Sequence, residues 1–412
     1  MQDPPPPPEA APPEAGPPAA DRPADPTTRR LRRKRWRRRA IAVFVGLTLP
    51  LFLVECGVRV LWSQLVHPNE TPLLEGATVS LGRGLIEESL RGPGDYIRGW
   101  ANHPLYIADD YRSLRLKPNL DTQKTLKDVP PAGLTFHVTT TAEGLRGPVE
   151  PPPPPNALRV LCVGDSMTFG EGVEDGETFP HKLQEGLAAA LGRPVRAFNA
   201  GVISLGQQEQ RDIVAELVPK LRPDLVLLQF TVANDVMDDW RWEDLPLGEK
   251  LRRRTNACET LEHHILLTNP LTRFSRAYRL GVWRWGRHAI RYRYMVERPN
   301  LERAARLLVG LRDLVRERAG RDVPVGVVIA PSVVQVERGL AETLLRTRRI
   351  NDGVSAGLRE AGVPVLDLLP GLRARADEGE SLYIQVDRHW NAAGCAAAAE
   401  LLVPFCRELL GA

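Results

Sequence analysis

Ser166 is the residue of this chain best placed to act as a nucleophile. It follows an apolar run, Val160–Val163, with the length and composition of a fully buried parallel strand. Gly164 at the end of that run permits a tight turn. Such a turn leaves the Ser166 hydroxyl above the carboxyl edge of the strand, where open α/β sheets bind their ligands. The serine is therefore a candidate nucleophile.

A serine hydroxyl is a weak nucleophile and needs a base beside it. Among the eight histidines, only His389 has an aspartate two positions before it, Asp387, in a loop directly before a predicted helix. Asp387 could hold one ring nitrogen while the other faces Ser166. A surface loop with a helix cap explains an Asp-x-His pattern equally well. The pattern alone leaves both interpretations open.

Four short stretches carry a resemblance to a known family. The stretch Gly164–Val173, which reads GDSMTFGEGV, resembles the first motif block of the SGNH/GDSL hydrolase family. Asn199–Gly206, Val232–Asp235 and Asp387–Asn391 resemble the remaining blocks, in the same order. Two of the four come directly after predicted strands. The resemblance extends from about Thr135 to the C-terminus.

The resemblance implies a role for each matching residue. Ser166 would be the nucleophile, His389 the base and Asp387 the acid that orients the base. The backbone N–H groups of Ser166 and Ser204 and the side chain of Asn234 would form the oxyanion hole. The sequence departs from the family twice. Ser204 stands where a glycine is usual, and Val232 replaces the glycine of the third block.

Five apolar runs form the predicted core of the molecule. Each except the last is followed by a loop and a helical pattern, which predicts a parallel sheet with helices on both faces. The runs are Val160–Val163, Val195–Phe198, Leu225–Phe230, Val325–Ile329 and Val363–Leu369. Helices are predicted at Pro180–Leu191, Gln208–Leu221 and Leu301–Glu317, with a last helix that Asn391 caps and that runs to Leu410. The predicted fold class is an α/β, three-layer α/β/α sandwich with a parallel, flavodoxin-like sheet of about five strands, preceded by one transmembrane helix.

The N-terminal part of the chain predicts a membrane anchor. Residues 1–39 are rich in proline and end in Arg29–Arg39, where nine of eleven residues are basic, so we expect a disordered cytoplasmic tail. Residues 40–62 form an apolar segment, about 35 Å long as a helix, which is enough to cross a bilayer. The basic run predicts a cytoplasmic N-terminus and an extracytoplasmic catalytic domain. Because no small-x-small cleavage site follows, an uncleaved single-pass anchor is favoured over a signal peptide.

Three further segments follow the anchor. Residues 63–155 are interpreted as a stalk that becomes a cap, with one strand at Leu134–Thr140 and a stiff proline spacer at its end. The hydrolase domain is expected at 156–412, with an insertion at about 237–299. Residues 271–298 combine aromatic residues at helical spacing with eight arginines. A helix packed on the core and a surface helix on anionic headgroups or a glycan both explain that pattern.

Charge and cysteine usage exclude other classes of protein. Outside the N-terminal tail the chain has 45 basic and 46 acidic residues, which argues against nucleic-acid binding. Five irregularly spaced cysteines do not form a disulfide framework. His263 and His264 lack a partner at ligand spacing, so we expect neither a metal site nor a cofactor. Asp165 is expected to fix the turn before Ser166 through hydrogen bonds to the backbone.

These observations predict a serine esterase that hydrolyses acyl esters and is tied to the membrane by its N-terminal helix. The family resemblance suggests O-acetyl groups on cell-surface glycans as the substrate. An O-acyltransferase acting on a surface polysaccharide would use the same residues and differ in its acceptor. A non-catalytic glycan-binding or scaffold module is a third alternative. Ser204 and Val232 favour this alternative. The intact Ser166, Asp387, His389 and Asn234 oppose it.

Overall fold

The structure is a computed structural model that divides into two units, Met1–Leu61 and Trp62–Ala412. It describes residues 26–61, 104–107, 115–127, 129, 132–148, 150–203, 205–242, 275–281, 292–293, 295–337, 342, 346–384 and 387–412. The larger unit contains every residue singled out above for chemistry.

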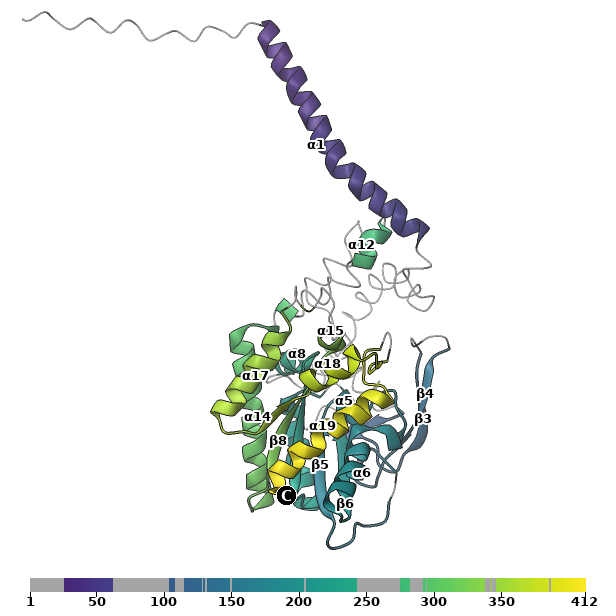
Figure 1. Ribbon diagram of the computed structural model, residues 1–412, viewed down its shortest axis with the longest axis vertical. Helices are drawn as coiled ribbons and strands as arrows, with labels where there is room; N and C mark the ends of the chain where they lie inside the picture. Colours follow the sequence, from purple (N-terminus) through teal and green to yellow (C-terminus); the bar gives the residue numbers. More distant parts are fainter. Residues whose placement is uncertain are drawn as a thin grey trace, which may run out of the picture. The chain divides into compact units, whose positions relative to one another are not determined.

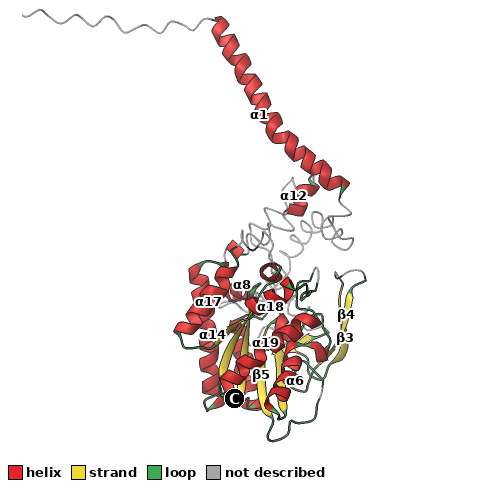
Figure 2. Ribbon diagram, in the orientation of Figure 1, coloured by secondary structure: helices red, strands yellow, loops and turns green. Residues whose placement is uncertain are grey.

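A parallel sheet of five strands forms the centre of the larger unit (Figures 1 and 2). Its strands, in spatial order, are β6 (Val195–Gly201), β5 (Leu158–Gly164), β7 (Leu225–Thr231), β8 (Val325–Ala330) and β9 (Val365–Asp367). Counted within the sheet, this order is 2-1-3-4-5. The order reverses between β5 and β7, and ligands of such sheets bind at that point, beyond the carboxyl ends of the strands.

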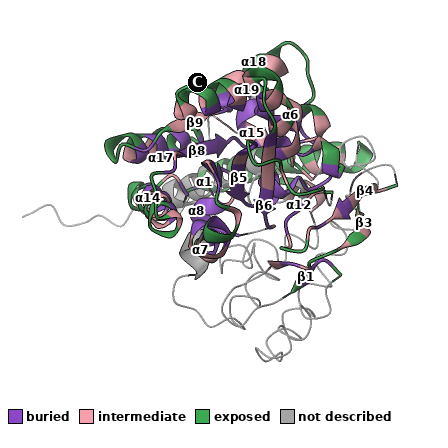
Figure 3. Ribbon diagram, turned by 90° about the horizontal axis from the view of Figure 1, so that it is seen from below, coloured by how far each residue is buried: buried purple, intermediate pink, exposed green. Residues whose placement is uncertain are grey.

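Helices cover both faces of the sheet (Figure 3). One face packs against α7 (Gln207–Leu221), α14 (Arg298–Ala319) and α17 (Arg348–Glu360), and the other against α6 (Phe179–Leu191) and α19 (Ala392–Leu410). Because successive strand residues point to opposite faces, β5 supplies both cores. Leu161 and Val163 face the first group of helices, whereas Val160 and Cys162 face the second. The predicted three-layer sandwich is thus confirmed.

Local signals set the ends of the helices. Asn391 Oδ1 accepts a hydrogen bond from Gly394 N at 2.9 Å and so caps α19, as predicted. Gly320, at φ 61°, ends α14. One apolar stripe of α14 is buried throughout, and it comprises Leu301, Ala304, Leu308, Leu311 and Val315.

The fifth strand is shorter than the sequence predicted. The apolar run Val363–Leu369 predicts a strand over seven residues, but β9 ends at Asp367 and α18 (Leu369–Asp377) begins where the run ends. Asp367 Oδ1 accepts a hydrogen bond from Leu369 N at 3.0 Å, and Pro370 lies in the first turn of the helix. Both features favour a helix start over a strand.

Two small antiparallel sheets precede the central sheet. One pairs β1 (Tyr106–Ile107) with β2 (Arg115–Leu116), and the other pairs β3 (Asp121–Leu126) with β4 (Leu134–Thr139). The prediction placed only β4. The sequence of β3, DTQKTL, has one apolar residue in six and is therefore too polar to signal a strand. Five short helices complete the described elements: α5 (Ser166–Phe169), η1 (Asp175–Glu177), α8 (Asp235–Trp242), α12 (Arg276–Gly281) and α15 (Val333–Val336).

In the described part of the N-terminal unit, residues 26–61, the chain forms one helix, α1 (Pro26–Val60). It begins earlier than predicted and includes the basic run expected to be disordered, because arginine and lysine are good helix formers. Among the described residues one helical segment, Trp36–Val60 within α1, is long and apolar enough to cross a membrane. Arg59 Nε lies 2.6 Å from Glu55 Oε1, one turn away.

The basic aromatic segment 271–298 lies largely outside the described residues. Of its described part, α12 is short, and Tyr292 and Met295 are buried in the core beside α14. These two residues pack as the core-helix interpretation expects.

Candidate active site

The turn after β5 presents Ser166 at the first position of the short helix α5. Asp165 is its N-cap, and Asp165 Oδ1 accepts a hydrogen bond from Met167 N at 2.9 Å. A side chain at Gly164 would place its Cβ 2.2 Å from Thr168 Oγ1 and 2.5 Å from Gln229 Oε1. Only glycine fits there, so the tight approach of α5 to β7 requires the first residue of the GDS sequence.

The loop before α19 brings His389 onto this turn. His389 Nε2 lies 2.7 Å from Ser166 Oγ, and its Nδ1 is hydrogen-bonded to Asp387 Oδ1. Arg388 between them has φ 74°, which reverses the chain locally and sets both neighbouring side chains on one side. Ile384 N donates to His389 O at 2.8 Å and closes the loop. The three side chains proposed from the sequence therefore form one hydrogen-bonded line.

Packing beneath the loop fixes its position. Tyr383 donates its phenol proton to Pro331 O at 2.8 Å, directly after β8. Trp390 is buried and meets the Phe179 ring edge-on, with ring centres 6.1 Å apart. The loop is thus held to the sheet on one side and to α6 on the other, which limits the freedom of the imidazole between them.

Charge couples the two ionisable members of this line. Burial of the His389 ring disfavours its charged form, but the hydrogen bond and negative charge of Asp387, helped by Glu171 and Asp165, raise the pKa of His389 above its usual value. Burial likewise disfavours the Asp387 carboxylate, but the hydrogen bond and charge of His389 lower the pKa of Asp387. The stability from Asp387 is lost as pH falls through its folded pKa, and that from His389 is lost as pH rises through its own.

Asp165 joins the nucleophile turn to the third block. It is fully buried; its Oδ1 accepts from Thr231 Oγ1 at 2.9 Å and its Oδ2 accepts from Asn234 Nδ2 at 3.0 Å. The expected role in the turn is therefore accompanied by a second one, in which the carboxylate ties the ends of β5 and β7 together. The sequence signal for this link was the order of the motif blocks, not any local pattern.

Asn234 is held by carboxylates on three sides. Its Nδ2 lies 3.0 Å from Asp165 Oδ2, 3.1 Å from Asp235 Oδ1 and 2.8 Å from Asp238 Oδ2. An amide nitrogen has two protons, so these three acceptors share them. The second expected donor, Ser204, lies outside the described residues. Val232 is buried, and its N–H donates to Ala330 O at 3.0 Å, which satisfies the backbone at the departure from the family pattern.

Arg146 is a structural residue that sequence reasoning did not single out. Its buried guanidinium donates to Asp175 Oδ1 at 3.0 Å, to Phe169 O at 2.7 Å and to Val173 O at 2.6 Å. It also lies 4.3 Å from the centre of the Phe169 ring. Arg146 thereby holds the segment that follows Ser166. No local pattern marks it, because its partners, the Asp175 carboxylate and several backbone carbonyls, lie elsewhere in the chain.

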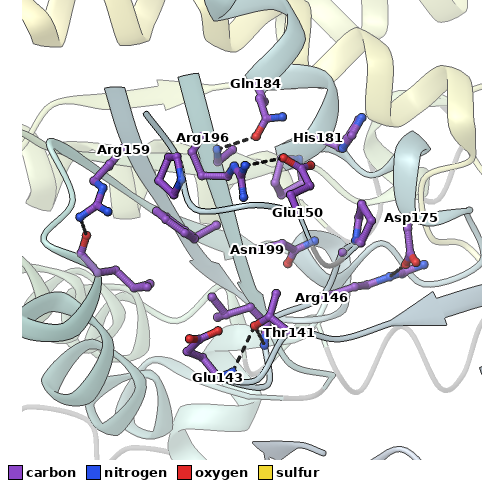
Figure 4. A pocket seen from close by; sticks show the side chains of 18 of the residues that line it. Thr141, Glu143, Arg146, Glu150, Arg159, Asp175, His181, Gln184, Arg196 and Asn199 are labelled. Atoms are coloured by element: carbon purple, nitrogen blue, oxygen red, sulfur yellow. Dashed lines mark hydrogen bonds and ion pairs between the residues drawn. The ribbon is translucent and has the colours of Figure 1, made fainter. Parts of the chain in front are cut away.

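A cavity of about 360 Å³ lies beside β6 (Figure 4). The proline spacer forms one wall of the cavity. Gln184 and the ion pair between Arg196 and Glu150, whose charged atoms are 2.6 Å apart, form another. Neither Ser166 nor His389 lines it, so this cavity is not where the line of three residues would act. Among the described residues no group of three or more histidine, cysteine, aspartate or glutamate side chains could hold a metal ion.

A parallel α/β/α sandwich with this serine, histidine and aspartate at its switch point is the fold of a serine hydrolase acting on ester bonds. The family model for the GDSL-like lipase/acylhydrolase family matches residues 162–397, more than half of the chain. The protein belongs to that family. The resemblance drawn from the four motif blocks is therefore confirmed.

Comparison with solved structures found proteins of low sequence identity. A member of the lipolytic G-D-S-L family from Veillonella parvula is 16% identical; the match covers 60% of this chain and 97% of that one, with a TM-score of 0.36. An acetylxylan esterase from Geobacillus stearothermophilus is 14% identical over 62% of this chain and 94% of that one, with a TM-score of 0.35. TesA is 13% identical; the match covers 61% of this chain and 99% of that one, with a TM-score of 0.37. A comparison with curated proteins found no match.

The charge coupling within the site predicts a measurable titration. In Asp387→Asn the imidazole loses its charged partner, so the pKa of His389 should fall while the chain stays folded. The measurement is an NMR titration of the His389 ring in both proteins, with His389→Ala used to assign its resonance. An unchanged titration in Asp387→Asn would show that the two side chains are not coupled in solution.

Proposed function

We propose that Ser166, His389 and Asp387 form the catalytic triad of an esterase that removes acyl groups, with O-acetyl groups on cell-surface glycans as the substrate class. The observation that carries the proposal is the 2.7 Å contact between Ser166 Oγ and His389 Nε2, with Asp387 on the other ring nitrogen. The choice of acetyl and glycan rests on the family resemblance and the candidate anchor.

The reaction follows from this geometry. Ser166 Oγ attacks the ester carbonyl and His389 Nε2 takes its proton, so a tetrahedral oxyanion forms. The imidazolium, stabilised by Asp387, gives that proton to the leaving alcohol, and an acyl group remains on Ser166. Water then attacks the acyl-enzyme with His389 again as base, which releases the acid and restores the serine. A sugar hydroxyl in place of water would complete acyl transfer instead.

The proposed triad predicts a non-additive loss of activity. Ser166→Ala and His389→Ala should each remove nearly all hydrolysis of 4-nitrophenyl acetate, since each removes one half of the same proton transfer. The double variant should lose little more, because the two residues act as a unit. Ser381→Ala, which removes an exposed hydroxyl, is the matched control and should retain full activity. Substantial activity in Ser166→Ala would mean that another residue is the nucleophile.

We further propose that the N–H groups of Ser166 and Ser204 and the amide of Asn234 bind the oxyanion. The position of Asn234 beside Asp165, the neighbour of Ser166, supports this assignment. An oxyanion would compete with the surrounding carboxylates for the Asn234 protons. The interaction would therefore form in the transition state and not before it.

The oxyanion assignment predicts a kinetic signature. Asn234→Ala should lower kcat about a hundredfold or more and leave KM nearly unchanged. Ser204→Gly restores the usual family residue and keeps the backbone donor, so it should be at least as active as the wild type. Urea unfolding of both variants separates a lost donor from a lost fold. A folded Ser204→Gly without activity would show that the hydroxyl itself takes part.

We also propose that α1 is an uncleaved anchor with its N-terminus in the cytoplasm and the hydrolase outside. The nine basic residues of Arg29–Arg39, directly before the apolar segment, support this orientation. An anchored enzyme on the outer surface would meet glycan esters and not cytoplasmic ones.

The orientation predicts the behaviour of reporter fusions in a bacterial host. Alkaline phosphatase fused after Ala412 should be active, because it folds only outside the cytoplasm, and β-galactosidase at the same place should be inactive. Replacing the nine basic residues of Arg29–Arg39 with glutamine should weaken this preference. The opposite reporter pattern would contradict the localisation and remove the main reason for a glycan substrate.

A further inference from the structure

The β3–β4 hairpin, which precedes the part of the chain that matches the family model, packs against the segment that carries Ser166. His137 N donates to Glu174 Oε2 at 3.0 Å, and Thr139 N donates to Asp175 Oδ2 at 2.9 Å. A Cβ on Gly172 would lie 3.2 Å from Leu126 Cδ1 and 2.3 Å from Ile384 Cδ1. Hairpin, nucleophile segment and His389 loop therefore meet at one place.

Lys124 is the charged residue that the hairpin brings to this junction. Its Nζ forms an ion pair with Glu171 Oε1 and lies 5.9 Å from the centre of the Phe169 ring. Its positive charge also acts on Asp387, in the loop that carries His389. Lys124 is thus the cation from the hairpin that faces the carboxylates around the imidazole.

Glu171 is a buried carboxylate close to the reaction centre. Its side chain is 6% exposed, and its backbone N–H donates to Ser166 O at 3.1 Å. Its Oε2 is buried and has no hydrogen-bond partner among the described residues. A buried carboxylate with one unpaired oxygen is costly unless a cation balances it. Lys124 supplies that cation.

The charges that face His389 come from three elements. Asp387 lies on its own loop, and Asp165 and Glu171 lie on the nucleophile segment. Lys124, on the hairpin, pairs with Glu171 and also acts on Asp387. Three carboxylates around one imidazole favour its protonated form, in which it cannot act as a base. The hairpin offsets one of the three.

We propose that Lys124 is a positioning residue for the ester-cleaving reaction: by pairing with Glu171 it balances a buried negative charge beside His389 and keeps the imidazole available as a base. The inference rests on the proposed role of His389. It gives the hairpin outside the matched family region a part in the chemistry, in addition to its part in packing.

The test compares the pH dependence of kcat/KM in charge variants. Lys124→Met should move the acid limb to higher pH by about half a unit or more, because an unbalanced carboxylate holds the His389 proton more strongly. Lys124→Met combined with Glu171→Gln should return the limb to the wild-type position or below it. Lys124→Arg keeps the charge and should keep the wild-type limb. Lys127→Met removes an exposed positive charge from the same hairpin and is the matched control.

An NMR titration of His389 in the same variants reads the imidazole without catalysis. The proposal predicts the same upward shift in Lys124→Met and its reversal by Glu171→Gln. A titration that does not move in Lys124→Met, or that moves without reversal, would overturn it. If the titration moves but no variant or wild-type protein hydrolyses an ester, the charge balance holds and the proposed function fails. Thermal unfolding of each variant confirms that it is folded.

Discussion

The hydrogen bonds to the Asp165 carboxylate are the contacts on which the rest of the site depends. It is fully buried, and it accepts hydrogen bonds from the backbone of the nucleophile turn, from Thr231 at the end of β7 and from Asn234. A buried carboxylate is costly unless hydrogen bonds or a cation compensate it. The same bonds that meet this requirement set α5 against β7, and the position of Ser166 follows from that.

Charge balance is a second constraint on this largely buried site. Four carboxylates bring negative charge to a small volume, those of Asp165, Glu171, Asp175 and Asp387. The positive charges that balance them lie on Arg146, Lys124 and the protonated His389 imidazole. Arg146 is buried, and desolvation lowers its pKa while Asp175 opposes that shift. Because the local dielectric is low around buried groups, both the attraction and the repulsion between their charges are strong. The cations that balance the site come largely from the segment before the catalytic fold, so that segment is part of the site.

Much of the catalytic fold could be predicted from the sequence. The strands of a parallel sheet are apolar throughout, and the turns after them carry motif residues, so β5 to β8, α6, α7, α14 and α19 were placed correctly. β9 was predicted too long because Leu368 and Leu369 extend the apolar run. Both side chains are buried at the start of α18 and not in the strand. β3 was not predicted, because its stability comes from pairing with β4 and from ion pairs rather than from an apolar face.

The site could be predicted only where a short motif records it. Ser166 and His389 are 223 residues apart in the sequence, yet the motif blocks proposed both of them together with Asp387. The structure places the three side chains in one hydrogen-bonded line. Arg146, Lys124 and Glu171 were not identified, because their partners are distant in sequence and their residue types are common on surfaces. Long-range contacts of this kind leave no local periodicity to read.

The central claim is that Ser166 is the residue that accepts the acyl group, and covalent labelling tests it most directly. The full-length protein would be treated with a fluorophosphonate, digested with trypsin and examined by mass spectrometry. The account predicts a single adduct on the peptide Val160–Lys182, in which Ser166 is the one serine, and loss of that adduct in His389→Ala. An adduct on another peptide, or none on an enzyme that still hydrolyses esters, would contradict it.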